Sequence, residues 1–491
     1  MPSLPSSSEL SSSRMTRRAL LGCLGVAGLV GGGLLWNNRP NRWRSGFTVH
    51  LLPPDAPSGA SPFLIGLQWV VQAHLSTLAP ACVVTVAHPE IPLPANRRAF
   101  QLQLRPSREG DTLSLSFRWR RAGEAWHEVQ GAPKPPAQAM AAFLAALPEA
   151  FQPDGEARLM PTAPELAWEL FDLAAIHRAF FTTKGLRSRL EGLVARAPEC
   201  ATAWCLFGRA AYLELVERRD WIAEDRVLAE TCLNKTLAIL PGLPFAAGEL
   251  SQMLSDFGEN GAALKVLARA IRIHPNSEVV LRRLAYSARN AGLLEVASRA
   301  LLVREAWMGR LEGIENTFLY LGDTKRFEDG ILNQARDKGW GPSQRFYLGY
   351  AALVRGNPEE ALRCLREARG EWSEARFGRI GFALWTFLEG RTQESLAALE
   401  KLVQQHLTIR TPDGEFILKL AELMALHGKV NRALDLATRA ASHGFGCVQW
   451  YEQSPLLAPI RSFLRFQALL FTLRERQTAQ ADRFPPRAFG F

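Results

Sequence analysis

The sequence predicts a mainly α-helical protein: a right-handed α-solenoid of helix hairpins, preceded by a small α+β domain and an N-terminal hydrophobic helix. A glycine recurs once per expected hairpin, with spacings of 34, 30, 34, 34 and 38 residues, at Gly258, Gly292, Gly322, Gly356, Gly390 and Gly428. Five residues after each glycine stands a residue that is small in all but one case: Ala263, Ala297, Phe327, Ala361, Ser395 and Ala433. A period of about 34 residues indicates stacked helix pairs.

The clearest copy of this repeat covers residues 348–368. Gly356 and Pro358 interrupt a helical pattern of small and apolar residues, which comprises Gly349, Ala352, Ala361, Leu365 and Ala368. The segment therefore predicts two short amphipathic helices joined by a tight turn, with small residues where the two backbones approach closely.

These units resemble the tetratricopeptide repeat family, whose pattern combines an apolar–Gly pair, alanines at helix contacts and a closing proline. Residues 247–275 match without insertion, through Ala247, Leu250, Leu254, Gly258, Ala263, Leu267, Ala270 and Pro275. Residues 204–241 match with about nine extra residues around Glu217 to Asp225. Residues 308–337 and 376–405 match less well, because Phe327 and Ser395 replace the alanine. The resemblance implies six to eight repeats, an α-solenoid over residues 167–445.

The N-terminal region carries a basic and then an apolar segment. Residues 1–18 are rich in Ser and Arg and predict a disordered basic N-terminus. Residues 19–36 contain no charge and predict a membrane anchor or uncleaved signal. A twin-arginine export signal at Arg17 and Arg18 and a buried helix are the alternatives, whereas a lipoprotein signal fails because the apolar run follows Cys23 instead of preceding it.

The orientation of this anchor is only weakly determined, because arginines stand on both of its flanks. We expect the body of the protein to lie outside the cytoplasm, in a bacterial periplasm or another extracytoplasmic space. A body that faces the cytoplasm is the alternative.

Residues 47–151 predict the α+β domain. Alternating strands are expected at 46–51, 82–86, 99–104, 111–119 and 125–129, and helices at 63–78 and 137–151. Through Leu113 to Phe117, the strand at Trp126 and the helix at Ala141 to Leu147, this order resembles the TolB-N-terminal-like or FlgO-like domain that precedes tetratricopeptide arrays. The resemblance implies an interaction or sensing module. Residues 152–166, rich in Pro and polar residues, predict a linker.

The C-terminal region departs from the repeat pattern. Residues 446–476 predict a capping segment, in which an amphipathic helix from Ile460 to Leu473 covers the open end of the stack. Residues 477–491 predict a frayed tail. A docking peptide at Phe489 and Phe491 is the alternative.

Charge and chemistry argue against several functions. The net charge of +10 is concentrated at the ends, since residues 1–44 carry six Arg against Glu9 and residues 474–491 carry four Arg against two acids. The body is therefore close to neutral, and no nucleic acid partner is expected. The seven cysteines form no C-x-x-C pair and predict buried thiols, the histidines are isolated, and no catalytic motif appears. We expect no enzyme, no cofactor and no metal.

Binding is the function that remains. In tetratricopeptide arrays the first helix of each pair lines the inner surface, and the shared phase then assigns a partner-binding groove to Gln252, Asp256, Arg282, Tyr286, Arg289, Asn290, Asn316, Phe346 and Tyr350. Arginines beside Tyr and Asn suit a carboxylate-bearing peptide, although a solvated helix face would look the same. The first hypothesis is a non-enzymatic, membrane-anchored scaffold that binds a protein or peptide through this groove. The alternative is an accessory or sensory envelope protein whose α+β domain binds a small ligand or wall component.

Overall fold

The computed structural model describes residues 47–52, 54, 62–77, 81–85, 99–121, 124–147, 159–178, 185–217, 223–311, 313–367, 376–408 and 413–491. The chain divides into two units, 1–45 and 46–491, and everything described belongs to the second. The predicted basic segment and membrane anchor, and residues 152–158 of the predicted linker, lie outside the described residues. Within the described residues, no helix is both long and apolar enough to span a bilayer.

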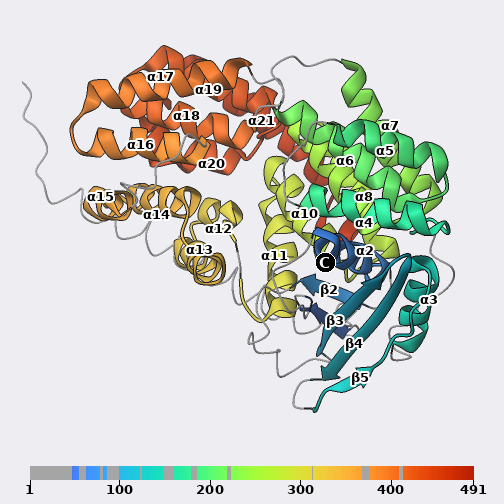
Figure 1. Ribbon diagram of the computed structural model, residues 1–491. Helices are drawn as coiled ribbons and strands as arrows, with labels where there is room; N and C mark the ends of the chain where they lie inside the picture. Colours follow the sequence, from blue (N-terminus) through green and yellow to red (C-terminus); the bar gives the residue numbers. More distant parts are fainter. Residues whose placement is uncertain are drawn as a thin grey trace, which may run out of the picture. The chain divides into compact units, whose positions relative to one another are not determined.

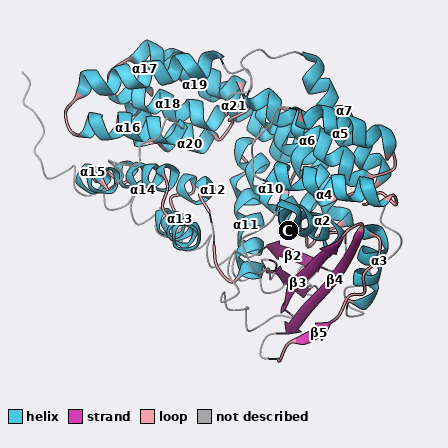
Figure 2. Cartoon of the chain, viewed as in Figure 1, coloured by secondary structure: helices cyan, strands magenta, loops and turns pink. Residues whose placement is uncertain are grey.

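The predicted α+β domain forms around one five-stranded sheet, in the order β2-β1-β3-β4-β5. Its strands are β1 (Phe47–Leu51), β2 (Ala81–Thr85), β3 (Ala99–Glu109), β4 (Thr112–Arg121) and β5 (His127–Val129). β1 pairs in parallel with β2 and β3, while β3, β4 and β5 pair antiparallel. The helices α2 (Pro62–Leu75) and α3 (Pro136–Ala146) complete the unit (Figures 1 and 2).

The sheet and the first array helices share one hydrophobic core. Alternation along β4 turns Leu113, Leu115 and Phe117 inward, where Phe117 meets Phe143 of α3 edge-on at 4.9 Å between ring centroids. Phe63 of α2 lies 5.3 Å from Trp168 at the start of the array, again between ring centroids. The α+β region is therefore packed directly against the helices that follow it.

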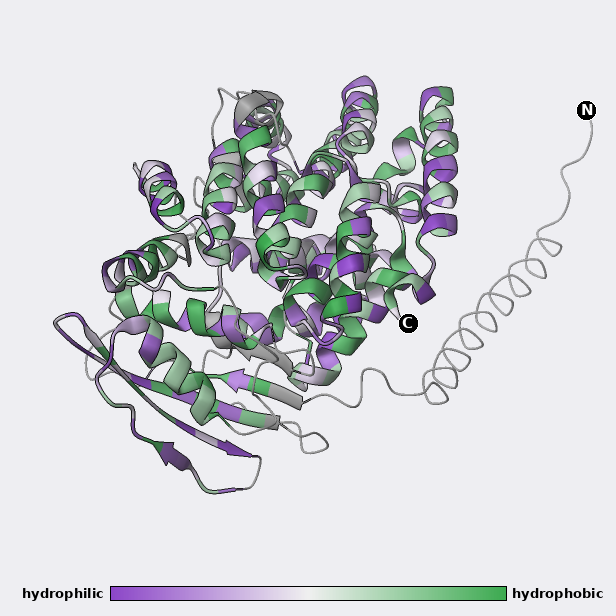
Figure 3. Cartoon of the chain, turned by 90° about the vertical axis from the view of Figure 1, so that its right-hand side faces the viewer, coloured by the Kyte–Doolittle hydropathy of each residue, from purple (hydrophilic) through white to green (hydrophobic). Residues whose placement is uncertain are grey.

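Consecutive helix pairs make up the described chain from Pro164 to Ser442, as the repeat pattern predicts. The pairs are α4 (Pro164–Arg178) with α5 (Leu186–Arg196), α6 (Ala201–Glu217) with α7 (Ala223–Ile239), α8 (Pro244–Asp256) with α9 (Asn260–Ile273), α10 (Glu278–Asn290) with α11 (Leu294–Met308), α12 (Asn316–Tyr320) with α13 (Thr324–Lys338), α14 (Pro342–Val354) with α15 (Pro358–Arg366), α16 (Arg376–Leu388) with α17 (Thr392–Thr408), and α18 (Gly414–Leu426) with α19 (Val430–Ser442). Hydrophobic and hydrophilic residues are interspersed along the helices (Figure 3). The predicted insertion, around Glu217 to Asp225, falls at the junction of α6 and α7. Each of these two helices has 17 residues.

The phased glycines end the first helix of their pairs. All six have positive φ, between 69° and 82°. At Gly356 the backbone N–H bonds to the carbonyl of Leu353, and the next N–H, that of Asn357, bonds to Ala352; the same two bonds recur at the other five glycines. This pattern closes an α-helix with a left-handed residue, which is the conformation that glycine adopts without steric cost.

The residues five positions later are all fully buried: Ala263, Ala297, Phe327, Ala361, Ser395 and Ala433. Phe327 follows the shortest first helix, α12, which has five residues. Ser395 satisfies its hydroxyl by donating to the carbonyl of Ala383 at 2.6 Å. The contact between the two helices of a pair is therefore preserved where the alanine is replaced.

The C-terminal region is more ordered than the sequence predicts. After α20 (Val448–Gln453) and the 3₁₀ helix η2 (Pro455–Ile460), α21 runs from Leu464 to Arg483 and η3 from Pro486 to Phe489. The prediction of a frayed tail at 477–491 is wrong, because Phe484, Phe489 and Phe491 are buried and η3 packs on α9. Burial of three phenylalanines outweighs the entropy of a free end.

Segments far apart in the sequence meet at the turn that contains Gly292. The Gly446 N–H donates to the carbonyl of Asn290 at 2.6 Å, and the Gln477 side chain donates to the carbonyl of Gly292 at 2.7 Å. A Cβ atom on Gly292 would lie 2.7 Å from the Gly446 carbonyl oxygen. The C-terminal segment therefore packs against the middle of the array, in addition to its end.

We predict that Gly349→Ala lowers the free energy of unfolding by about 1–3 kcal/mol, because the added methyl would stand 2.7 Å from Leu365 Cγ. Gly192→Ala is the matched control: the position is also helical, nothing lies within 4 Å of the new atom, and a gain of about 0.5–1 kcal/mol is expected. Urea unfolding followed by circular dichroism measures both, and equal effects of the two changes would contradict the close helix contact.

Candidate functional site

Polar side chains from the first helices of three consecutive pairs converge on Asp256. Tyr212 of α6 and Tyr286 of α10 both donate their hydroxyls to the Asp256 carboxylate, the second at 2.5 Å, and Gln252 donates to it at 3.3 Å. Burial raises the pKa of Asp256, while the tyrosine hydrogen bonds oppose that rise. The three first helices are thus joined through one carboxylate.

An ion-pair ladder lies beside Asp256. Glu249 of α8 accepts from Arg209 of α6 at 2.7 Å and from Arg283 of α10 at 3.2 Å. Burial alone would raise the pKa of Glu249, but the two guanidiniums hold it below its ordinary value. Arg283 also donates to Gln252, which links the ladder to Asp256. We call this set the inner strip: Arg209, Tyr212, Glu249, Gln252, Asp256, Arg283 and Tyr286.

A second cluster is centred on Glu415, in the first turn of α18. Its carboxylate pairs with Arg289 of α10 at 3.0 Å and accepts from Asn316 of α12 at 2.7 Å and from the Tyr320 hydroxyl. Although burial opposes the charge, Arg289 and Lys419 lower the pKa of Glu415 to about 2. Glu415 therefore remains ionised inside the protein.

Lys419, one helical turn later, is almost completely buried. Its ammonium donates to the Tyr320 hydroxyl at 3.0 Å and lies 5.4–5.6 Å from the ring centroids of Tyr320, Tyr347 and Tyr350. Cation–π attraction of this kind is strongest where water is excluded. The three tyrosines come from α12 and α14.

Glu422 completes this face of α18. It accepts from the Tyr350 hydroxyl at 2.5 Å, from Trp450 Nε1 at 3.0 Å and from Ser454 Oγ at 2.6 Å. Burial raises its pKa above the ordinary glutamate value, and these hydrogen bonds only partly offset that rise. We call Glu415, Lys419 and Glu422 together with their partners the α18 cluster. The partners are Arg289, Asn316, Tyr320, Tyr347, Tyr350, Trp450 and Ser454.

The α18 cluster corrects the prediction of an open groove. Five of the predicted groove residues are buried in it or next to it and do not line an open surface: Arg289, Asn290, Asn316, Phe346 and Tyr350. Glu415, Lys419 and Glu422 lie on one face of α18 at a spacing of i, i+4 and i+7. That face packs onto α10, α12 and α14, so the chain itself occupies the surface expected to bind a partner there.

The other four predicted residues lie at or near the inner strip. Gln252, Asp256 and Tyr286 share hydrogen bonds, as described above. Arg282 instead is half-exposed and meets Glu278 of its own helix at 3.9 Å, while the neighbouring Arg283 points into the strip. The repeat phase thus selects the right helix but misses this arginine by one position.

The sequence interpretation missed several functional candidates: Arg209, Tyr212, Glu249, Arg283, Glu415, Lys419 and Glu422. A signal for the last three was available, because charged residues at i, i+4 and i+7 interrupt an otherwise apolar helix. Such a helix is buried all round and must find partners for its charges. In the structure every residue from Gly414 to Ala425 is buried.

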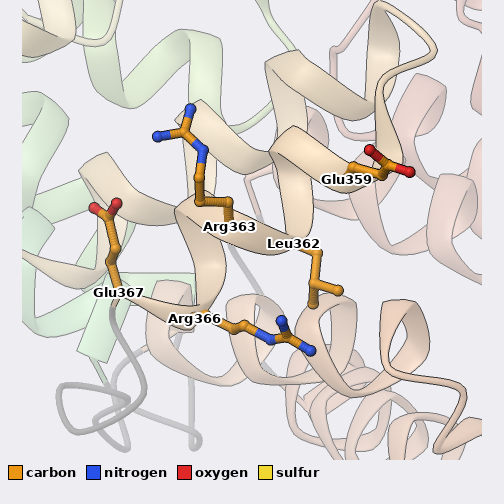
Figure 4. Close-up of a pocket in the computed structure, with 5 residues that line it drawn as sticks. All are labelled: Glu359, Leu362, Arg363, Arg366 and Glu367. Atoms are coloured by element: carbon orange, nitrogen blue, oxygen red, sulfur yellow. The ribbon is translucent and has the colours of Figure 1, made fainter.

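A shallow surface depression lies on α15, away from both clusters. It is lined by Glu359, Leu362, Arg363, Arg366 and Glu367, whose side chains spread along one helix (Figure 4). Arg366 pairs with Glu389 at 3.1 Å, and Glu367 pairs with Arg345. These charges stabilise contacts between neighbouring helix pairs, so we assign no ligand to the depression.

The described cysteines are free thiols, and most of them are buried. Cys200, Cys205, Cys232 and Cys447 are buried free thiols, as predicted, while Cys364 is half-buried. Burial raises the pKa of Cys447 to about 12, so it is not a reactive thiolate. In this part of the chain no group of three or more His, Cys, Asp or Glu side chains is arranged to hold a metal.

This architecture defines a helical-repeat protein with a small sheet near its N-terminus. No protein-family model matches the chain, and no match was found among curated proteins. Among solved structures, the chain is similar to a monomeric mutant of IFIT1 with m7Gppp-AAAA, at 14% identity and a TM-score of 0.36. The match covers 62% of this chain and 77% of that chain. The function of this chain is therefore inferred from its own contacts.

We predict that Glu415→Gln and Glu422→Gln lower the free energy of unfolding by very different amounts, although both replace a carboxylate in the same helix. Glu415→Gln leaves Arg289 buried without its counter-ion and should cost about 3–5 kcal/mol at pH 7. Glu422 accepts mainly from neutral donors, so Glu422→Gln should cost less than about 1.5 kcal/mol. Chemical unfolding measures both.

The pH dependence provides the control. Because the folded-state pKa of Glu415 is depressed to about 2, its contribution to stability is present above about pH 4.5 and is lost as the pH falls toward 2. The difference in unfolding free energy between wild type and Glu415→Gln should shrink over that range. A difference that does not change between pH 7 and pH 3 would contradict the buried ion pair.

Proposed function

We propose that this protein is a non-enzymatic scaffold of the tetratricopeptide type, anchored to a membrane by residues 19–36, with its body outside the cytoplasm. In this proposal the array binds a protein or peptide at the inner strip. The observation that carries the proposal is the strip itself: polar groups from three successive first helices, aligned across the stack and only partly buried at Arg209, Gln252 and Arg283. A partner that lies across the stack would meet several of them at once.

The charge of the inner strip favours a peptide over a nucleic acid. Two guanidiniums stand beside two carboxyl groups, so the strip holds no excess of positive charge. A phosphate backbone is bound through uncompensated Lys and Arg side chains. Peptides, by contrast, offer alternating donors and acceptors that suit a balanced set of Arg, Gln, Tyr and carboxylate groups.

A second candidate site lies on the polar face of the sheet. Arg118 donates to Gln103 at 2.6 and 2.9 Å and Arg120 donates to Gln101 at 2.7 Å, and both guanidinium carbons lie 4.6 Å from the Trp126 ring centroid. Because the glutamines are neutral, they leave the positive charge of both arginines in place. This supports the alternative of a sensory envelope protein that binds a small anionic ligand or wall component there.

We predict that Arg282→Glu at the edge of the strip and Arg283→Gln within it each weaken partner binding about tenfold or more. Full-length protein extracted from membranes would be crosslinked, the recurrent partner identified by mass spectrometry, and its affinity measured with the purified partner. Arg269→Glu, exposed on the second helix α9, is the matched control and should leave the affinity unchanged.

Three results would contradict this proposal. Partner binding that survives both strip substitutions, in proteins whose melting temperatures match wild type, places the site elsewhere. Loss of binding on Arg118→Gln alone transfers the function to the sheet. If a nucleic acid copurifies with the wild type and is lost in Arg282→Glu, the partner is a nucleic acid and not a peptide.

A further inference from the structure

A three-residue segment just after α19 bridges the turns of two helix pairs that lie far back in the sequence. On one side, the side chain of Asn260, the first residue of α9, donates to the Gly444 carbonyl at 2.6 Å. On the other side, the Gly446 N–H donates to the carbonyl of Asn290, the last residue of α10, at 2.6 Å. We call residues 444–446 the C-terminal bridge.

Glycine lets the C-terminal bridge approach both turns at backbone distance. Gly258 and Gly444 have φ of 82° and 89°, in the left-handed region that glycine adopts without steric cost. A Cβ atom on Gly444 would lie 2.5 Å from the Gly258 Cα, and one on Gly292 would lie 2.7 Å from the Gly446 carbonyl oxygen. No side chain fits at either contact, so the turns that end α8 and α10 are both held on the same short segment.

These two turns end the two helices that carry most of the inner strip. Asp256 is the last residue of α8, and Tyr286, one turn before the end of α10, donates to it at 2.5 Å. The Ser255 and Ser287 hydroxyls form a second hydrogen bond between the same two helices, at 2.8 Å. A change in the spacing of the two turns would therefore stretch hydrogen bonds of the inner strip itself.

The C-terminal bridge makes this spacing depend on a distant part of the chain. In a stack of repeats each unit contacts its neighbours, so the spacing of α8 and α10 is ordinarily set by local contacts. Here Asn260 and Gly444 are 184 positions apart, and Gln477 of α21 donates to the Gly292 carbonyl from 185 positions away. The region after α19 thus acts on the same two helices as their own neighbours.

We propose that the C-terminal bridge is a latch. Closed, it holds α8 and α10 at the spacing at which the inner strip binds its partner; released, it lets the two helices loosen and lowers the affinity. This inference rests on the proposed function of the inner strip and adds a control element to it. A preorganised site binds more tightly because its groups are already ordered, and by linkage a bound partner in turn stabilises the closed latch.

The first test compares two left-handed glycines of the last helix pair. Gly444→Ala places a methyl group 2.5 Å from the Gly258 Cα, whereas Gly428→Ala, at φ 69°, meets nothing within 4 Å. Both changes therefore strain the backbone, but only the first opens the C-terminal bridge. Hydrogen exchange of the full-length protein, followed by mass spectrometry, should be at least about tenfold faster in α8 and α10 for Gly444→Ala and unchanged there for Gly428→Ala.

Gln477→Ala tests the same latch without backbone strain, and it decides the question if Gly444→Ala does not fold. It removes only the donor to the Gly292 carbonyl, so exchange at the end of α10 should be about threefold faster. Gln467→Ala is the matched control. Gln467 also lies on α21 and donates to a backbone carbonyl at 2.7 Å, but that carbonyl belongs to Arg461, so α10 should keep its wild-type rates.

A disulfide between α8 and α10 separates positioning of the strip from general destabilisation. Ser255→Cys and Ser287→Cys would join the two helices directly, where the hydroxyls are now 2.8 Å apart. In Gly444→Ala protein this bond should return exchange in both helices to wild-type rates. The affinity for the purified partner recovered by crosslinking should fall about fivefold in Gly444→Ala and recover with the disulfide.

Two results would overturn the proposal. Wild-type exchange in α8 and α10 in both Gly444→Ala and Gln477→Ala would show that the C-terminal bridge is ordinary packing. Faster exchange in these helices with an unchanged affinity for the partner would show that the latch does not control binding. Because the exchange measurement needs no partner, failure of the latch and failure of the proposed function are told apart.

Discussion

The burial of α18 is the constraint on which the second half of this structure depends. A helix whose residues are all buried cannot leave Glu415, Lys419 and Glu422 unpartnered, because an isolated buried charge is prohibitively costly. Arg289, Asn316, three tyrosines, Trp450 and Ser454 supply those partners from four other segments. Since hydrogen bonds and ion pairs require defined distances, the cluster also sets how α10, α12, α14 and α20 are placed around α18.

This arrangement divides the inner surface of the array into two parts with different roles. Around α18 the first helices face one another, and the polar groups there stabilise the fold. Along α6, α8 and α10 the inner strip retains partly exposed arginine, glutamine and tyrosine side chains. A buried polar network gives specificity of packing, whereas a half-buried one can still be reached by a partner. The inner strip is therefore the better candidate for binding.

The C-terminal segment links the repeat turns to the rest of the chain. Gly258 and Gly292 end helices like the other phased glycines, but they also admit the backbone at Gly444 and Gly446 at distances that a side chain would block. Gln477 and the buried Phe489 extend this contact along α21 and η3. One face of α21, with the buried Phe466, Leu470 and Leu473, is used for packing.

The repeat architecture could be read from the sequence alone, because its signals are local. A glycine at φ near 80° and a buried small residue five positions later depend only on neighbouring turns, so Gly356 and Ala361 specify their hairpin wherever it lies. The strands at 99–104 and 111–119 were predictable for the same reason. The candidate site was predictable only in part. Gln252, Asp256 and Tyr286 follow from the repeat phase, but the choice of Arg283 over Arg282 depends on the rotation of α10 against α8.

Other features come from contacts between residues 72 or more positions apart, or from surfaces that meet only after folding. They are the burial of Tyr350 and Phe346, the docking of Phe489 and the role of Glu415. Only the tertiary structure decided these, because helix periodicity reports which face of a helix is apolar and not which distant segment covers it.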